Sequence, residues 1–242
     1  MTSPGPYLSL VIPAFNEERR LGPTLLAWRA FFADQSYSFE LLVVDDGSSD
    51  RTADVAQSGG ARVLQLPLNQ GKGAAVRAGM LDAGGRWLGY VDADLNVAPT
   101  HVPAALACLE RGADVVVGQR DLAEYAAAEA VPRLLAGGLV QITRRLLVLR
   151  TIRDTQCGFK FFRRELARAV FRRAQVRSFA FDIEVLFLAR KLGAHIVELP
   201  VRTQYRAGSS VDLRKHLGRF VLDIARIRLS DLTGRYSVSC RG

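Results

Sequence analysis

Cysteine and histidine are scarce in this chain of 242 residues. The three cysteines, Cys108, Cys157 and Cys240, are odd in number and far apart, with no paired spacing. This pattern excludes a disulfide framework and a zinc site, and it indicates reduced thiols in a cytosolic protein. The three histidines are isolated from one another and from the cysteines, which disfavours a histidine-based metal site.

Long apolar runs are also absent. No stretch approaches the roughly 18–20 consecutive apolar residues that a membrane-spanning helix needs. Residues 1–6 carry no apolar run behind a basic cluster, so we expect no signal peptide. With 49% hydrophobic and 24% charged residues, the chain can bury a full core, and we expect a single α/β domain over residues 1–242.

Two common glycine-rich nucleotide motifs are missing. No G-x-G-x-x-G follows the first predicted strand, which disfavours dinucleotide-dependent redox chemistry. The stretch Asn69–Gly73 lacks both the upstream glycine and the following Ser or Thr of a P-loop.

Charge is distributed unevenly along the chain. Residues 1–110 hold 8 Lys and Arg against 12 Asp and Glu, a net charge of −4, whereas residues 111–242 hold 25 against 12, a net charge of +13. The basic second half should attract an anionic partner: phosphate, nucleic acid or a membrane surface.

Apolar segments of strand length alternate with helical patterns in the first half. The predicted strands are 7–12, 39–44, 62–66, 86–91 and 113–117, and helical spacing separates them. This alternation predicts a doubly wound, mostly parallel sheet. Beyond residue 118 we expect a strand within 154–162, another at 194–198, and helices over 131–149, 163–177, 179–192 and 212–229.

Polar clusters follow four of the predicted strands. They are Pro13–Glu17, Asp45–Asp50, Asn69–Gly73 and Asp92–Asn96. In an open parallel sheet such loops share one edge, where ligands bind. The sequence therefore predicts a nucleotide site in one crevice.

The last of these clusters contains carboxylates spaced one residue apart. Period-two geometry at a strand end directs Asp92, Asp94 and Asn96 to the same side. Three oxygen donors suit a hard cation, Mg²⁺ or Mn²⁺, which can also bind a substrate diphosphate. The alternative is a polar loop that caps the next helix.

The other clusters offer groups for the rest of a nucleotide. Lys72 stands among glycines at a predicted helix start, where free N–H groups and the helix dipole favour an anion. Asp45 or Asp46 can accept a hydrogen bond from a base or a ribose hydroxyl. The alternatives are a surface lysine and an aspartate-capped turn.

Six motifs taken together resemble the family 2 glycosyltransferases, in order over roughly residues 7–210. They are Pro-Ala-Phe-Asn-Glu (13–17), Asp-Asp-Gly-Ser-Ser-Asp (45–50), Asn-Gln-Gly-Lys-Gly (69–73), Asp-Ala-Asp-Leu (92–95), Gly-Gln-Arg (118–120) and Asp-Thr-Gln-Cys-Gly-Phe-Lys (154–160). Within that family the chain is similar to the dolichyl- and polyprenyl-phosphate sugar synthases. Residues 154–160 resemble the phosphodolichol β-glucosyltransferase branch, and phosphomannose synthases share part of this motif.

The resemblance implies a GT-A fold and the inverting transfer of a hexose from a nucleotide-diphosphate sugar to a lipid phosphate. It implies a nucleotide-binding half (1–118) and an acceptor-binding half with amphipathic helices (119–242). The residues that it places at the nucleotide sugar are Pro13, Phe15, Glu17, Asp45, Asp46, Lys72, Asp92, Ala93 and Asp94. It places Mg²⁺ or Mn²⁺ on Asp94, Asp92 and Asn96, the acceptor phosphate on Arg120 and Arg133, and Asp154 at the reaction centre.

The acceptor expected from the resemblance needs positioning more than deprotonation, because a phosphate monoester has a second pKa of about 6. Two roles for Asp154 are therefore open: a base for the monoprotonated fraction, or a group that aims the arginines. The sequence departs from the family at Ser210, where relatives commonly have lysine. Either Arg202 or Arg206 supplies that charge, or the loop holds the leaving group less tightly.

UDP-glucose is favoured on branch resemblance alone, since acids and a lysine near the base do not separate uracil from guanine. GDP-mannose as donor and a non-lipid acceptor are the alternatives. We expect no nucleic-acid partner, because no basic motif interleaved with aromatics is visible. The basic helices over 131–149 and 212–229 predict a peripheral protein at the cytoplasmic face of a membrane. The other interpretation of 212–229 is ordinary packing on the sheet with a solvated basic face.

Overall fold

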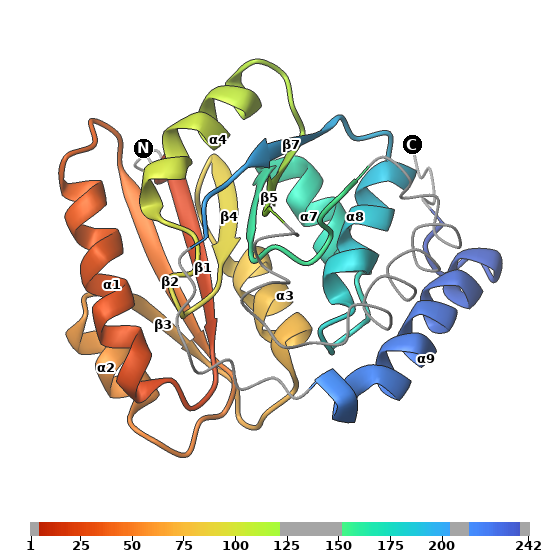
Figure 1. The fold of residues 1–242 in the computed structure, drawn as a ribbon, viewed down its shortest axis with the longest axis horizontal. Coiled ribbons are helices and arrows are strands. Elements are labelled where there is room, and N and C mark those ends of the chain that lie inside the picture. Colours follow the sequence, from red (N-terminus) through yellow and green to blue (C-terminus); the bar gives the residue numbers. More distant parts are fainter. Residues whose placement is uncertain (1–4, 122–151, 204–212, 238–242) are drawn as a thin grey trace.

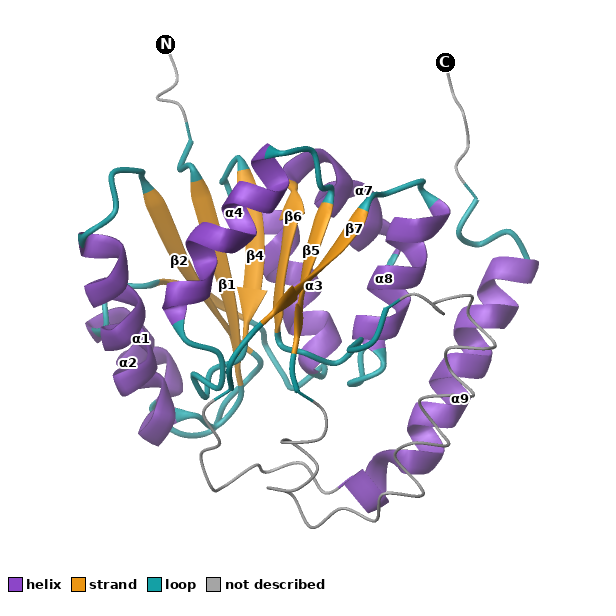
Figure 2. Cartoon of the chain, turned by 45° about the horizontal axis from the view of Figure 1, so that its top comes forward, coloured by secondary structure: helices purple, strands orange, loops and turns teal. Residues whose placement is uncertain are grey.

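A computed structural model describes residues 5–121, 152–203 and 213–237, and within them the strands form one seven-stranded sheet (Figures 1 and 2). The strand order is β3-β2-β1-β4-β6-β5-β7. The strands are β1 (Leu8–Ala14), β2 (Phe39–Asp45), β3 (Arg62–Gln65), β4 (Trp87–Val91), β5 (Val115–Gln119), β6 (Phe159–Arg163) and β7 (Ile196–Pro200).

The sheet is mostly parallel, as predicted, and β6 is the strand that runs against its neighbours. Its first residue, Phe159, pairs with Val91 at the end of β4, and its last, Arg163, pairs with Trp87 at the start of β4. The chain that leads into β6 therefore lies at the same edge as the chain that leaves β4. This reversal brings the 154–158 turn beside the Asp92–Asn96 loop.

Helices cover both faces of the sheet (Figure 2). One face packs against α1 (Glu18–Ala33), α2 (Thr52–Ser58), the short 3-10 helix η1 (Pro99–His101) and α4 (Val102–Glu110). The other packs against α3 (Lys72–Asp82), α7 (Arg164–Arg173) and α8 (Phe181–Lys191), and α9 (Leu213–Leu232) packs against α8. Along β1, Leu10 and Ile12 join the first core and Val11 joins the second. Coverage on both faces explains why the central strands are apolar throughout.

The helix α9 differs in part from the prediction for residues 212–229. Ile224 and Ile227 are buried as expected, but Val221, which was placed on the same face, is 48% exposed. The predicted helix over 131–149, with Arg133, lies outside the described residues. Among the described helices, none combines the length and apolar character needed to cross a membrane.

Candidate active site

The loops that follow β1 and β2 are tied to each other at one edge of the sheet. The N–H of Asn16 donates to Ser48 Oγ at 2.9 Å, and the N–H of Ser49 donates back to Asn16 Oδ1 at 2.9 Å. Asn16 adopts a left-handed backbone (φ 55°), which asparagine tolerates better than most residues. The predicted convergence of these loops is thus confirmed.

Asp46 ties the 69–73 loop to this assembly. Its two carboxylate oxygens accept the N–H groups of Gln70 and Gly71, both at 2.8 Å. Burial raises the pKa of Asp46 above its usual value, although the two amide donors act in the opposite direction. Asp45 is also buried, and its Oδ1 accepts the N–H of Ser48 at 3.1 Å. Both side chains brace the loops here, and their contact with a base or ribose stays a prediction.

Lys72 and Asp92 form an ion pair at this edge of the sheet. Lys72 is the first residue of α3, and its Nζ lies 2.5 Å from Asp92 Oδ1. Burial lowers the pKa of Lys72, but the charges of Asp92 and Asp182 outweigh this and leave it above the usual value. Lys72 therefore carries a full positive charge next to the acidic loop, as an anion site requires.

Asp94 lies beside this pair and is held by Asn96. The backbone N–H of Asn96 donates to Asp94 Oδ1 at 3.1 Å, and its side-chain amide donates to Oδ2 at 2.5 Å. Leu95 between them has a left-handed backbone (φ 57°), which turns the loop back on itself. Burial and then the charge of Asp92 raise the pKa of Asp94. Asn96 positions Asp94 in this structure, and its role as a metal ligand stays a prediction.

The donor atoms of this loop fit a cation shared with a substrate. Among the described residues, no group of three or more His, Cys, Asp or Glu side chains could hold a metal ion. Two carboxylates, Asp92 and Asp94, nevertheless offer oxygen to a hard cation, and Mg²⁺ keeps several ligand positions for phosphate and water. A cation held here would depend on a bound diphosphate to complete its coordination.

A second ion pair lies at the start of the 154–158 turn. Arg120 follows β5 and contacts Asp154 with two nitrogens, Nε to Oδ2 at 2.7 Å and a terminal nitrogen to Oδ1 at 3.1 Å. Burial raises the pKa of Asp154, but the hydrogen bonds and charge of Arg120 outweigh it and hold the pKa below the usual value. Glu198 of β7 fixes the turn by accepting the N–H groups of Arg153 (2.6 Å) and Asp154 (3.2 Å).

Gly158, at the end of the turn that begins with Asp154, contacts Asp92. Its carbonyl accepts the N–H of Asp92 at 3.2 Å, and a Cβ built on Gly158 would lie 1.9 Å from Asp92 Oδ2. Only glycine allows this approach. Asp92 and Asp154 are therefore set relative to each other by one short turn of the chain.

The residues that were predicted to contact the base and ribose also lie at this edge of the sheet. Glu17 accepts two hydrogen bonds from Arg20, at 2.6 and 2.7 Å, and the ring of Phe15 is 44% exposed. Burial raises the pKa of Glu17, while Arg20 lowers it in part. Pro13 and Ala93 are buried, and the Ala93 carbonyl accepts the hydroxyl of Thr24 at 2.6 Å. Phe15 is the exposed aromatic surface on which a base can stack.

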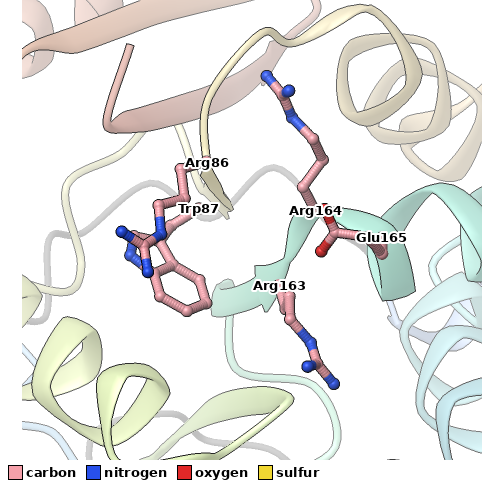
Figure 3. Close-up of a pocket in the computed structure, with 5 residues that line it drawn as sticks. All are labelled: Arg86, Trp87, Arg163, Arg164 and Glu165. Carbon is pink, nitrogen blue, oxygen red and sulfur yellow. The ribbon is translucent and has the colours of Figure 1, made fainter. Parts of the chain in front are cut away.

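A pocket of about 300 Å³ lies elsewhere, at the opposite edge of the sheet (Figure 3). It is lined by Arg86, Trp87, Arg163, Arg164 and Glu165, at the start of β4 and the end of β6. Arg164 Nε donates to the carbonyl of Gly85 at 2.6 Å, and Arg163, whose side chain is 53% exposed, pairs with Asp114. These contacts indicate a structural role for both arginines.

Two features of the site were missed by sequence reasoning. Glu198 was not singled out, because an acid in a short strand gives no sign of the backbone amides that it accepts. Lys160 was noted only as part of a motif, although it is fully buried. A lysine between Phe159 and Phe161 in an apolar strand was the available signal.

Comparison with known proteins identifies the family. The profile of the family described as "Glycosyl transferase family 2" matches residues 9–171. A dolichyl-phosphate beta-glucosyltransferase of Dictyostelium discoideum is 34% identical over 96% of this chain and 77% of its own length. Those of Drosophila melanogaster and Homo sapiens are 38% and 32% identical, over 86% and 97% of this chain and 70% and 78% of their lengths.

Solved structures support the fold. Glucosyl-3-phosphoglycerate synthase from Mycobacterium tuberculosis, in complex with phosphoglyceric acid, superposes with a TM-score of 0.70 at 23% identity, over 98% of this chain and 82% of that one. The same enzyme with Mn²⁺, UDP-glucose and phosphoglyceric acid gives a TM-score of 0.68 at 22% identity, over 98% and 82% of the two chains. The likeness confirms the GT-A fold. The chain therefore belongs to glycosyltransferase family 2 and is a glycosyltransferase.

Proposed function

We propose that the protein transfers glucose from UDP-glucose to a polyprenyl or dolichyl phosphate, with inversion and with Mg²⁺ or Mn²⁺. The observation that carries this proposal is the juxtaposition of two charged groups across Gly158. The Lys72–Asp92 pair with Asp94 suits a diphosphate, and the Arg120–Asp154 pair suits a second phosphate. The names of the relatives, dolichyl-phosphate beta-glucosyltransferases, supply the sugar and the acceptor class.

The reaction forms one bond and breaks one. An oxygen of the acceptor phosphate attacks C1 of the glucose, and the bond from C1 to the UDP diphosphate breaks on the opposite face. Lys72 stabilises the negative charge of the departing UDP, and Asp94 and Asp92 would hold a divalent cation that would add to this stabilisation. Because the acceptor phosphate is already an anion at neutral pH, the transfer needs no strong base.

The geometry around Asp154 favours orientation over proton transfer. Both of its oxygens are engaged by Arg120, and Oδ1 also accepts the N–H of Gln156 at 3.1 Å. Its lowered pKa makes it a weak base. We therefore assign Asp154 to holding Arg120 toward the acceptor phosphate, with Arg133 as a second proposed phosphate contact.

Donor and acceptor can be tested separately. UDP-glucose with Mn²⁺ should raise the melting temperature by several degrees, and GDP-mannose with Mn²⁺ should raise it by less. In the transfer assay, radiolabelled glucose should move from UDP-glucose to a short polyprenyl phosphate and not to 3-phosphoglycerate. A larger shift with GDP-mannose would contradict the donor, and label on 3-phosphoglycerate alone would contradict the lipid acceptor.

We also propose that the protein acts as a peripheral protein at the cytoplasmic face of a membrane, through α9. Its outer side carries a row of exposed apolar residues beside Arg226 and Arg228, which suits an anionic bilayer surface. The row comprises Val221 (48% exposed), Leu222 (60%), Leu229 (61%) and Leu232 (72%).

The double variant Leu222→Ser/Leu229→Ser should bind vesicles containing anionic lipid at least tenfold more weakly than wild type, because each buried leucine contributes about 1.5–3 kcal/mol. Flotation measures this binding, and raising the salt concentration should weaken the wild type as well. Leu26→Ser is the matched control, since Leu26 is 71% exposed on α1. Equal flotation of the α9 variant and wild type would rule out this surface.

Gly158→Ala should lower the transfer rate by at least about tenfold, since sub-ångström displacement of reacting groups is costly. The added methyl group cannot fit beside Asp92 Oδ2, so Asp92 must move away from Lys72. Gly218→Ala is the control: nothing lies within 4 Å of a Cβ at that position in α9. Steady-state rates of both variants check the prediction, and a Gly158→Ala rate equal to wild type would contradict the assigned contact.

A further inference from the structure

A buried lysine lies under the candidate site and takes no part in the chemistry proposed above. Lys160 of β6 is completely buried, and its Nζ contacts Asp182 Oδ1 of α8 at 2.5 Å. Tyr90 of β4 donates its hydroxyl to the same oxygen at 2.5 Å. A fully desolvated ion pair is costly, and apolar residues of similar volume are often as stable in its place. The core alone therefore gives no reason for a charge at this position.

Lys160 also holds the turn that joins the two halves of the site. Its Nζ donates to the carbonyl of Cys157 at 2.7 Å. The next residue, Gly158, carries the carbonyl that accepts the N–H of Asp92, and Asp154 at the start of the turn holds Arg120. Lys160 thus holds the turn at Cys157, near its end, and Glu198 holds it at Asp154, where it begins.

Lys160 is linked to both carboxylates of the site. Gly158, two residues earlier in the chain, accepts the N–H of Asp92. For Asp154, burial and Arg120 dominate, and the charge of Lys160 also favours the ionised form. Lys160 is placed between the donor and acceptor ends, where it acts on each without contacting a substrate.

We propose that Lys160 is a positioning residue for the transfer reaction: its ammonium group, anchored on Asp182, fixes the 154–158 turn and thereby sets Asp154 and Asp92 at their working separation. This inference rests on the proposed function for the identity of the reacting groups. The effect should fall mainly on the chemical step, because Lys160 contacts Cys157, Asp182 and Tyr90, and none of these is assigned to the base or ribose.

Lys160→Met tests the proposal, because methionine keeps the length of the side chain and removes the ammonium group. We expect kcat to fall at least about thirtyfold while KM for the nucleotide sugar changes less than about threefold, as misplacement of reacting groups predicts. Lys191→Met is the matched control, since Lys191 pairs with Asp231 away from the site, and it should keep the wild-type kcat. A kcat within threefold of wild type in Lys160→Met would overturn the proposal.

Two further variants separate positioning from stability, since removing one partner leaves Asp182 buried and unpaired. Lys160→Met/Asp182→Asn removes both charges, so its melting temperature should return toward wild type while kcat stays low. Asp182→Asn alone removes the anchor of the ammonium group and should also lower kcat, but by less than Lys160→Met, because the bond from Lys160 to the Cys157 carbonyl remains. Recovery of kcat in the double variant, or loss of nucleotide binding together with kcat, would show a purely structural role and overturn the proposal.

If Lys160→Met fails to fold, the kcat of Lys160→Met/Asp182→Asn tests the proposal in its place. All ratios are taken with whichever of UDP-glucose and GDP-mannose the wild type turns over. A wrong donor would then contradict the proposed function and leave the comparison for Lys160 intact.

Discussion

Replacing Asp94 by alanine should lower the rate of transfer by at least about a thousandfold, because the proposed cation would lose an oxygen ligand and would stabilise the departing diphosphate less. The folded state should survive, since the described hydrogen bonds to the Asp94 carboxylate come from its own loop, through Asn96. Rates at saturating Mn²⁺ measure the effect, and circular dichroism checks the fold.

Asp82→Ala is the control for this variant. Asp82 is 44% exposed in its side chain at the end of α3, where it pairs with Arg62, so its loss should leave the rate unchanged. A rate for Asp94→Ala within tenfold of wild type would remove Asp94 from the reaction and with it the assigned cation site.

Loss of either member of the Arg120–Asp154 pair should cost about a hundredfold in rate, because the acceptor phosphate is then no longer aimed at the sugar. Arg120→Lys keeps the charge but loses the two-nitrogen contact with Asp154, and Asp154→Asn loses the partner that fixes the guanidinium. Arg163→Lys is the matched control, since Arg163 forms an exposed pair with Asp114 far from the site.

The double variant distinguishes the two roles of Asp154. If Asp154 acts through Arg120, the double variant Arg120→Lys/Asp154→Asn should be no slower than the worse single variant. If Asp154 instead acts as a base, the fold losses in rate of the two single variants should multiply in the double variant.

The pH dependence gives an independent check on Asp154. Because the pKa of Asp154 lies below its usual value, its carboxylate stays ionised as the pH falls from about 7 to about 5. Any loss of rate in this interval should follow protonation of the acceptor phosphate, with a pKa of about 6, and should persist in Asp154→Asn. A pH profile that becomes flat in Asp154→Asn would point to proton transfer by Asp154.

The architecture was largely predictable because strands covered on both faces are apolar throughout and are punctuated by polar loops. The direction of β6 was not, since the run Phe159–Phe162 has the same character whichever way it enters the sheet. Only pairing with Val91 at one end and Trp87 at the other defines it as antiparallel.

The site was predictable as a set of loops but not as a set of contacts. Asp46 shows why: an acid in a polar loop has the same sequence signature whether it faces a ribose or the amides of Gln70 and Gly71. The partners of Lys160 come from β4 and α8, at positions that no local pattern links to it. Long-range pairing of charges is decided by packing, which a single sequence does not encode locally.

The reversed strand β6 has a consequence for engineering this enzyme. The chain leaves the sheet at Gln119 and returns at Phe159 on the same rim, so nothing in the strand pairing dictates how long the intervening stretch must be. Loop closure costs grow only slowly with length. Exchange of residues 121–153 between homologues, with Arg120 and Asp154–Gly158 left in place, should therefore leave the pairing of β5 with β6 and the donor-side loops intact.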